Sequence, residues 1–282
     1  MTLRRVLPLL LVVLSLITIQ AFPSDDTHMR LARISYLEGN VSYQNPVDPD
    51  WASASINMPL EPGDRIYTGP GGKTEIEFDD GSVVRLAEHT DVDIMDLRTD
   101  LVRIRILQGF TYINARGTAD FEINTPAAAF SISRIGLYRF HVRENGDVDA
   151  IVRKGSLGAA NDSFQRRIEQ GERLYIHYAD SGRPLLSMYG SRDAWDEWND
   201  RRDADRVALA SRRHIPDSVH IGVSELDRHG RWANVSSHGW VWVPHSVNAL
   251  WSPYTKGRWL YRPFYGWTWV SYEPWGWLPY HY

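Results

Sequence analysis

The chain has 282 residues, no cysteine and a formal net charge of −4. The lack of cysteine excludes disulfide bonds, thiolate zinc sites, iron–sulfur clusters, a cysteine nucleophile and a lipid-modified cysteine. The slightly acidic balance argues against general nucleic-acid binding, which requires a basic surface. The unusual feature is tryptophan, because nine of the twelve tryptophans lie between Trp232 and Trp277.

The N-terminal end predicts a secretory signal peptide over residues 1–21. Arg4 and Arg5 precede an apolar run from Val6 to Ile19, and Ala21 provides the small residue of a cleavage site. This run of about 14 residues is shorter than the roughly 20 residues of a membrane-spanning helix, which disfavours an uncleaved anchor. We therefore expect a periplasmic or extracellular protein, soluble or attached to a membrane only through a partner.

Residues 34–178 predict a β domain, because apolar and polar side chains alternate in short runs separated by turn-forming residues. One hairpin joins Lys73–Phe78 to Val83–Leu86 across an Asp-Gly turn, and another joins 136–142 to 148–152 across an Asn-Gly turn. Strands at a spacing of roughly 8 to 12 residues, with no helix between them, favour a mainly β, antiparallel sandwich-like or barrel-like domain.

The periodicity then changes, and residues 191–214 are predicted to form a helical linker. Asp193 is placed to cap the first turn. Trp195 and Trp198 belong to a stripe at helical spacing, which indicates one amphipathic helix of about 18 residues that docks its tryptophan edge on a sheet. Pro216 ends this helical pattern.

The remaining segment, 222–282, contains an internal repeat. Gly230-Arg231-Trp232 recurs as Gly257-Arg258-Trp259, and 239–243 recurs as 266–270, both at an offset of 27 residues. Because both the residues and their separation are repeated, we predict a small tryptophan-rich β tail. The last residues look like the start of a third copy, and two interpretations stay open: the chain is cut within the repeat, or it caps there.

Alternation along a strand places the tryptophans of each copy on one face. They form either a structural cross-strand ladder or a recognition surface for sugar rings or a peptide, and the sheet face that points away from the core decides between the two. Five basic residues against two acidic ones between 227 and 273 favour an anionic envelope glycan or an envelope protein as partner, with no role for nucleic acid. The candidate ligand-binding residues are Trp232, Trp240, Trp242, Trp259, Trp267, Trp269, Arg231 and Arg258.

Motifs for catalysis are absent from the sequence. It contains no Gly-x-Ser-x-Gly, no phosphate-binding glycine-rich loop and no His-Glu-x-x-His, and its ten histidines lack the spacing of metal ligands. The carboxylate pairs Asp79/Asp80 and Asp91/Asp93 fall in a turn and on one strand face, where solvation is the default. We therefore expect no catalytic residues, no metal, no cofactor and no enzymatic activity.

Several motifs together resemble the periplasmic β domain named after FecR, the ferric citrate regulator. Leu60–Gly69, which contains Pro-Gly-Asp, is followed by Asp80–Leu86, which contains Asp-Gly-Ser. The similarity continues through Ile123–Ala127 and Val152–Ser156, and it covers about 34–176. The resemblance implies a β structure that relays a signal between a transporter and an anti-sigma segment, or that serves in other exported proteins.

Two departures from this family bear on function. FecR-type regulators have a cytoplasmic helical domain ahead of one transmembrane helix, whereas five residues precede the apolar run here, so a sigma-regulating role is not expected. The segment Arg134–Arg139 stands where many members show an Arg-Gly-Thr step, which puts the usual partner contacts in question. From Arg192 onward the sequence is similar to the tail that follows this domain in exported proteins of unknown function.

These observations favour a non-catalytic periplasmic or cell-surface binding protein. Its β domain would be the scaffold for a partner or ligand, and its Trp/Arg tail would contact envelope glycan or protein, while the oligomeric state stays open. The first alternative is an accessory of FecR-type transmembrane signalling. The second is a carbohydrate-active enzyme, which requires two carboxyl groups facing one cleft at roughly 5 to 9.5 Å.

Overall fold

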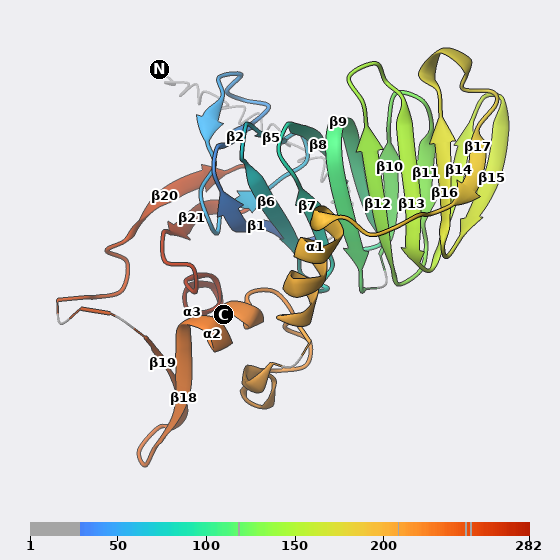
Figure 1. Ribbon diagram of the computed structural model, residues 1–282. Helices are drawn as coiled ribbons and strands as arrows, with labels where there is room; N and C mark the ends of the chain where they lie inside the picture. Colours follow the sequence, from blue (N-terminus) through green and yellow to red (C-terminus); the bar gives the residue numbers. More distant parts are fainter. Residues whose placement is uncertain (1–28, 118, 208, 246, 249) are drawn as a thin grey trace, which may run out of the picture.

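The computed structural model describes residues 29–282 except 118, 208, 246 and 249 (Figure 1). The predicted signal peptide over 1–21 lies outside the described residues. The described part is mainly β, as predicted, and strands β1 to β17 are arranged in two facing sheets. None of its helices is long and apolar enough to cross a membrane.

Sheet I contains, in spatial order, β4 (Pro59–Leu60), β1 (Ala32–Glu38), β6 (Lys73–Phe78), β7 (Val83–Leu86), the second half of β9 (Leu101–Ala115), β12 (Gly136–Val142), β13 (Val148–Lys154), β16 (Glu172–Ile176) and β17 (Leu185–Met188). Sheet II contains β3 (Ala52–Ser53), β2 (Val41–Gln44), β5 (Arg65–Thr68), β8 (Thr90–Leu97), the first half of β9, β10 (Asp120–Asn124), β11 (Ala129–Ile132), β14 (Ser156–Asn161) and β15 (Phe164–Glu169). Both predicted hairpins are confirmed as β6–β7 and β12–β13.

The long strand β9 belongs to both sheets. Its first half pairs with β8 and, in parallel, with β10, and its second half pairs with β7 and β12. Gly109 lies between the halves with φ +94°, and a Cβ built there would meet the Thr90 Cα at 2.4 Å. A glycine is required at this bend because other residues rarely adopt positive φ and because the neighbouring backbone lies too close.

The core fills the space between the two sheets, as expected for a sandwich. Phe130 of sheet II contacts Phe140 of sheet I at 5.2 Å between ring centroids, and Phe121 contacts Phe78 at 5.6 Å. Alternate residues of the strands point into this layer, which accounts for the period of two in the sequence. The sandwich expected from strand spacing is therefore confirmed.

Helix α1 (Ala194–Ala204) begins where predicted, but two expectations about it are wrong. Asp193 caps it, and Asp196 completes a capping box. The helix has 11 residues rather than about 18, and a separate 3₁₀ turn, η2 (Ala210–His214), follows. Its buried residues are Asp196 and Asn199, so it is not amphipathic in the predicted sense, and Trp195 and Trp198 stay partly exposed.

The polar face of α1 is buried because sheet I presents charged side chains beneath it. The Glu75 carboxylate of β6 forms ion pairs with Arg85 Nε at 2.6 Å and with Arg202 Nη2 at 2.9 Å. The neighbouring Glu77 carboxylate lies 2.5 Å from Arg206 Nη2. Burial by itself would raise the pKa of Glu75, but the surrounding guanidinium groups hold it well below its usual range. A buried ion-pair network thus attaches the linker to the sandwich.

Each copy of the sequence repeat forms its own two-stranded hairpin. The first is β18 (Gly230–Val235) with β19 (Gly239–Pro244), and the second is β20 (Gly257–Arg262) with β21 (Gly266–Ser271). Figure 1 shows β20 and β21 beside β1 and β2, whereas β18 and β19 project away from the sandwich. Three short helical segments were not predicted: η1 (Tyr178–Asp180), α2 (Val223–His229) and α3 (Trp277–His281).

Candidate functional site

The second hairpin is docked on the sandwich through its aliphatic face. Val270 belongs to the main hydrophobic core, and Leu260 packs against the same core. Arg262 is buried in an ion pair with Asp64, and its Nε lies 3.4 Å from Glu61. Asn57 Nδ2 donates to the carbonyl oxygen of Ser271, the last residue of β21, at 3.0 Å and to that of Glu273 at 2.8 Å. The tail is therefore continuous with the β domain.

The opposite face of this hairpin is an aromatic ladder that points away from the core. The register pairs Trp259 with Trp269 and Tyr261 with Trp267, and the ring centroids of both pairs are 5.6 Å apart. The Trp259, Tyr261 and Trp267 side chains are 56, 57 and 68% exposed, whereas Trp269 is buried. The second repeat therefore turns three large aromatic side chains toward solvent.

A hollow of 370 Å³ adjoins this ladder. Tyr254 lies parallel to Trp259 at a centroid distance of 6.3 Å and forms part of the wall with Tyr280. Burial lowers the pKa of His281, so its ring is neutral at neutral pH, and burial together with Glu273 raises the pKa of Tyr280 to about 12. The hollow therefore offers ring faces and hydroxyl groups rather than charge. It is lined by Leu31, Pro59, Tyr254, Trp259, Tyr265, Trp267, Thr268, Trp269, Trp277, Tyr280, His281 and Tyr282.

The first hairpin uses the opposite face for docking. Trp232 Nε1 donates to Ser211 Oγ at 2.8 Å, and Trp242 Nε1 donates to the Leu226 carbonyl at 3.0 Å. Both indoles pack against the small cluster around α2. Trp240 is more exposed, with its ring 4.7 Å from that of His214. The six candidate tryptophans are thus divided: Trp232, Trp242 and Trp269 pack within the fold, and Trp240, Trp259 and Trp267 face solvent.

The two candidate arginines do not join the aromatic ladder. Arg231 is exposed on the first hairpin, and Arg258 alternates with Trp259 and so lies on the docked face of the second. The positive charge expected for the tail is also reduced, because Arg262 is neutralised by Asp64 and Arg228 lies 3.3 Å from Asp205. Sequence could not show this, since the acidic partners lie far away along the chain.

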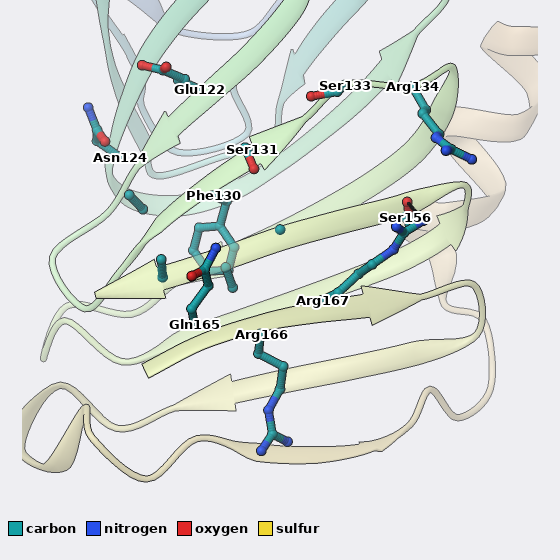
Figure 2. Close-up of a pocket in the computed structure, with 14 residues that line it drawn as sticks. Glu122, Asn124, Phe130, Ser131, Ser133, Arg134, Ser156, Gln165, Arg166 and Arg167 are labelled. Atoms are coloured by element: carbon teal, nitrogen blue, oxygen red, sulfur yellow. Dashed lines mark hydrogen bonds between the residues drawn. The ribbon is translucent and has the colours of Figure 1, made fainter. Parts of the chain in front are cut away.

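A second hollow, of 620 Å³, lies on the outer face of sheet II and was not predicted. Figure 2 shows Arg134, Arg166 and Arg167 around strands that carry small and hydroxyl side chains. Arg167 Nη2 donates to Ser156 Oγ at 2.9 Å, and its Nε lies 2.7 Å from Glu169. Glu122 also lines the hollow, so its rim carries charges of both signs. Sequence missed it because outward polar residues on strands are also typical of a plain solvated face.

The acidic pairs considered in the sequence are engaged in ion pairs. Arg65 Nε donates a hydrogen bond to the Asp91 carboxylate at 2.9 Å, and the same nitrogen lies 3.5 Å from Asp93. Asp79 and Asp80 both pair with Arg30. Within the part of the chain that the structure describes, no three histidine or acidic side chains gather as metal ligands would.

The sequence matches two family models, and the first, described as FecR protein, covers residues 64–157. The chain contains a FecR domain. A second model, described as a family of unknown function (DUF6600), covers residues 223–282. The two matched regions contact each other, because Asp64, the first residue matched in the FecR domain, pairs with Arg262 of the second region.

Two crystal structures of a protein from Parabacteroides distasonis, described provisionally as an anti-sigma factor, are similar to part of the chain. They are 19 and 18% identical to it, each with a TM-score of 0.39 over 44% of this chain. The chain spans 59% of the length of that protein. No curated protein matches the sequence.

Proposed function

We propose that the chain is a non-catalytic, exported envelope protein that binds envelope polysaccharide through the aromatic face of its second hairpin. One observation carries the proposal: this hairpin docks by its aliphatic face and leaves Trp259, Tyr261 and Trp267 exposed. Large aromatic side chains that stay in water after folding mark interaction surfaces. The flat face of an indole ring suits the C–H face of a sugar ring, because both are apolar and planar.

The neutrality of the adjoining hollow supports a sugar rather than a strongly charged polymer. The hollow lined by Tyr254 and Tyr280 offers hydroxyl donors and acceptors but no basic side chain except His281, which is neutral. Binding through ring stacking and neutral hydrogen bonds depends little on salt, whereas binding through arginines is screened. We therefore expect the affinity for polysaccharide to depend only weakly on ionic strength.

No catalysis is included in the proposal. A glycosidase needs two carboxyl groups facing one cleft, and no aspartate or glutamate is among the residues that line the hollow beside the ladder. The FecR domain favours a second candidate function, in which the chain is an accessory of FecR-type transmembrane signalling. In that case the hollow rimmed by Arg134 and Arg166 would receive an acidic segment of a protein partner.

Co-sedimentation with insoluble peptidoglycan and with purified envelope polysaccharide tests the proposal. The double variant Trp259→Ala/Trp267→Ala removes the two exposed indoles of the ladder without changing the docked face. We expect its bound fraction to correspond to at least a tenfold weaker affinity. The matched control is Trp51→Ala, which removes an indole that is 45% exposed beside β3 of the sandwich and should bind like the wild type.

Equal binding by the double variant and the wild type would overturn the proposal. Capture of a specific envelope protein that the double variant retains, and that Arg134→Glu/Arg166→Glu abolishes, would favour the signalling accessory instead. Deletion of the whole tail is a poorer test, because it removes Val270 from the core and leaves Asp64 buried without its arginine.

A further inference from the structure

A third hollow, of 1080 Å³, lies between α1 and the part of the FecR domain where β9 bends. Its walls come from the turn after β7, the bend in β9, the end of β12 and the first turns of α1, which lies across the front of the sandwich (Figure 1). The volume is slightly above the roughly 300–1,000 Å³ that is typical of small-molecule sites, which leaves room for a ligand of several rings. It is also larger than both hollows described above. We call it the helix-side cavity.

Two stacked aromatic pairs line this cavity, one from the sheet and one from the helix. Phe110 and His141 are cross-strand partners on β9 and β12, with ring centroids 3.7 Å apart and planes 13° apart. Trp195 and Trp198 are three residues apart on α1 and stack at 4.9 Å and 11°. Arg139 lies over the Phe110 ring at 5.4 Å, and Lys73 lies over the Trp198 ring at 5.9 Å, so each pair also carries a cation. The cavity is therefore bounded by aromatic rings from two separate elements.

Polar side chains of both signs complete the lining. Lys73 and Arg143 supply positive charge, Glu88 supplies negative charge, and Gln108 offers an amide. Burial, followed by the charge of Arg143, lowers the pKa of His141 to about 4. At neutral pH the imidazole is therefore uncharged and offers one donor and one acceptor. Mixed donors and acceptors beside aromatic faces match the hydroxyl groups and ring faces of a sugar.

The helix that carries the tryptophan pair is held firmly on the sheet. Arg139 of β12 reaches Asp193 at 2.7 Å and Asp196 at 3.1 Å, and the Tyr189 hydroxyl donates to Asp196 at 2.7 Å. These contacts fix the first turn of α1 relative to β12. The two aromatic pairs are thus positioned before a ligand arrives, which lowers the entropic cost of binding.

The backbone around the cavity disfavours an extended peptide as the occupant. Peptides that bind sheets usually add a strand to a free edge. Here β9 is paired with β7 and β12 on its two sides, and the Phe110 carbonyl already accepts from Ala87 N at 3.0 Å. No unpaired strand edge therefore faces this cavity among the described residues that line it.

We propose that the helix-side cavity is an oligosaccharide-binding site, in which sugar rings stack against the Trp195/Trp198 and Phe110/His141 pairs. The site is separate from the aromatic ladder, and the inference goes beyond the proposed function because it places a second sugar site on the FecR domain itself. The expected ligand class is a neutral or weakly anionic oligosaccharide of several rings.

Isothermal titration calorimetry with two soluble probes tests the inference: a hexamer of N-acetylglucosamine and a hexasaccharide that contains uronic acid. We expect at least one probe to bind, and Trp195→Leu and His141→Ala each to weaken it at least tenfold. Trp195→Leu keeps apolar volume at a partly exposed position, and near-ultraviolet circular dichroism of both variants shows that the fold is retained. Trp240→Ala, which removes an indole that is 55% exposed on the first hairpin and does not line the cavity, is the control with unchanged affinity.

The double ladder variant separates this inference from the proposed function. If the site is the helix-side cavity, Trp259→Ala/Trp267→Ala keeps the affinity for the soluble probe. Loss of binding in that variant, together with wild-type affinity in Trp195→Leu, would overturn the inference while leaving the proposed function in place. Failure of both saccharides to bind, or preferential binding of an extended hexapeptide, would also overturn it.

Discussion

Replacing Arg262 by methionine removes the charge that joins the tail to the FecR domain while keeping most of the aliphatic stem. The Arg262 side chain is 4% exposed, and its partner Asp64 is fully buried. The variant leaves the Asp64 carboxylate buried with only a backbone donor, the amide of Glu61 at 2.8 Å. Breaking a buried ion pair on one side costs about 3–5 kcal/mol.

The pH dependence of this loss follows from Asp64. Burial raises its pKa from 3.8 to about 6, even though Arg262 opposes the shift. A raised carboxyl pKa means that the folded state favours the protonated form, so the associated stability is present below pH 4 and is lost as the pH rises through 6. The shift corresponds to about 3 kcal/mol. Without Arg262 the pKa rises further, so the penalty of the variant is largest above pH 7 and smaller near pH 5.

Urea unfolding followed by tryptophan fluorescence measures both effects, because the tail holds most of the tryptophans. At pH 7.5 we expect Arg262→Met to lower the free energy of unfolding by about 3–5 kcal/mol, and by clearly less at pH 5. The control Arg231→Met changes an exposed arginine and should stay within about 0.5 kcal/mol of the wild type. A loss below about 1 kcal/mol at pH 7.5, or a loss that is equal at both pH values, would refute the reasoning.

Two further predictions concern the FecR domain. Glu75→Gln should lower the free energy of unfolding by about 3–5 kcal/mol at neutral pH, because Arg85, Arg202 and Arg206 lose their shared carboxylate. The pKa of Glu75 is lowered in the fold, so its contribution is present above pH 4.5 and is lost on acidification. The variant should therefore lose less stability than the wild type below pH 4.5, and parallel pH curves would contradict this. Gly109→Ala should cost more than about 1 kcal/mol in urea unfolding, whereas Gly190→Ala, whose added Cβ meets nothing within 4 Å, should be nearly neutral; similar effects of both would contradict the account of the bend.

The sandwich could be predicted because its signals are local. The period of two along Lys73–Phe78 and the Asp-Gly turn after it specify a hairpin whatever lies elsewhere in the chain. The capping residue Asp193 is also a local signal, and it marked the start of α1 correctly. The 27-residue repeat indicated β structure in the tail in the same way, and each copy forms a hairpin.

Features that depend on distant residues could not be predicted. The face of α1 that is buried depends on Glu75, which pairs with Arg202 across 127 residues of sequence and so favours arginines over an apolar stripe on that face. The sequence also could not predict which face of each hairpin docks on the rest of the fold, because valines and tryptophans are both apolar enough to be buried. In the second hairpin the buried ion pair between Arg262 and Asp64 fixes which face docks on the sandwich, and these two residues are 198 positions apart in the sequence.

Residue-resolved oxidation of tryptophan by N-bromosuccinimide, with and without bound envelope polysaccharide, tests the central claim most directly. The proposed function predicts that polysaccharide protects Trp259 and Trp267 from oxidation, while Trp51, which is also exposed, is oxidised at an unchanged rate. Oxidation of Trp259 and Trp267 at the same rate in the bound and free protein would contradict the claim that the aromatic ladder is the contact surface.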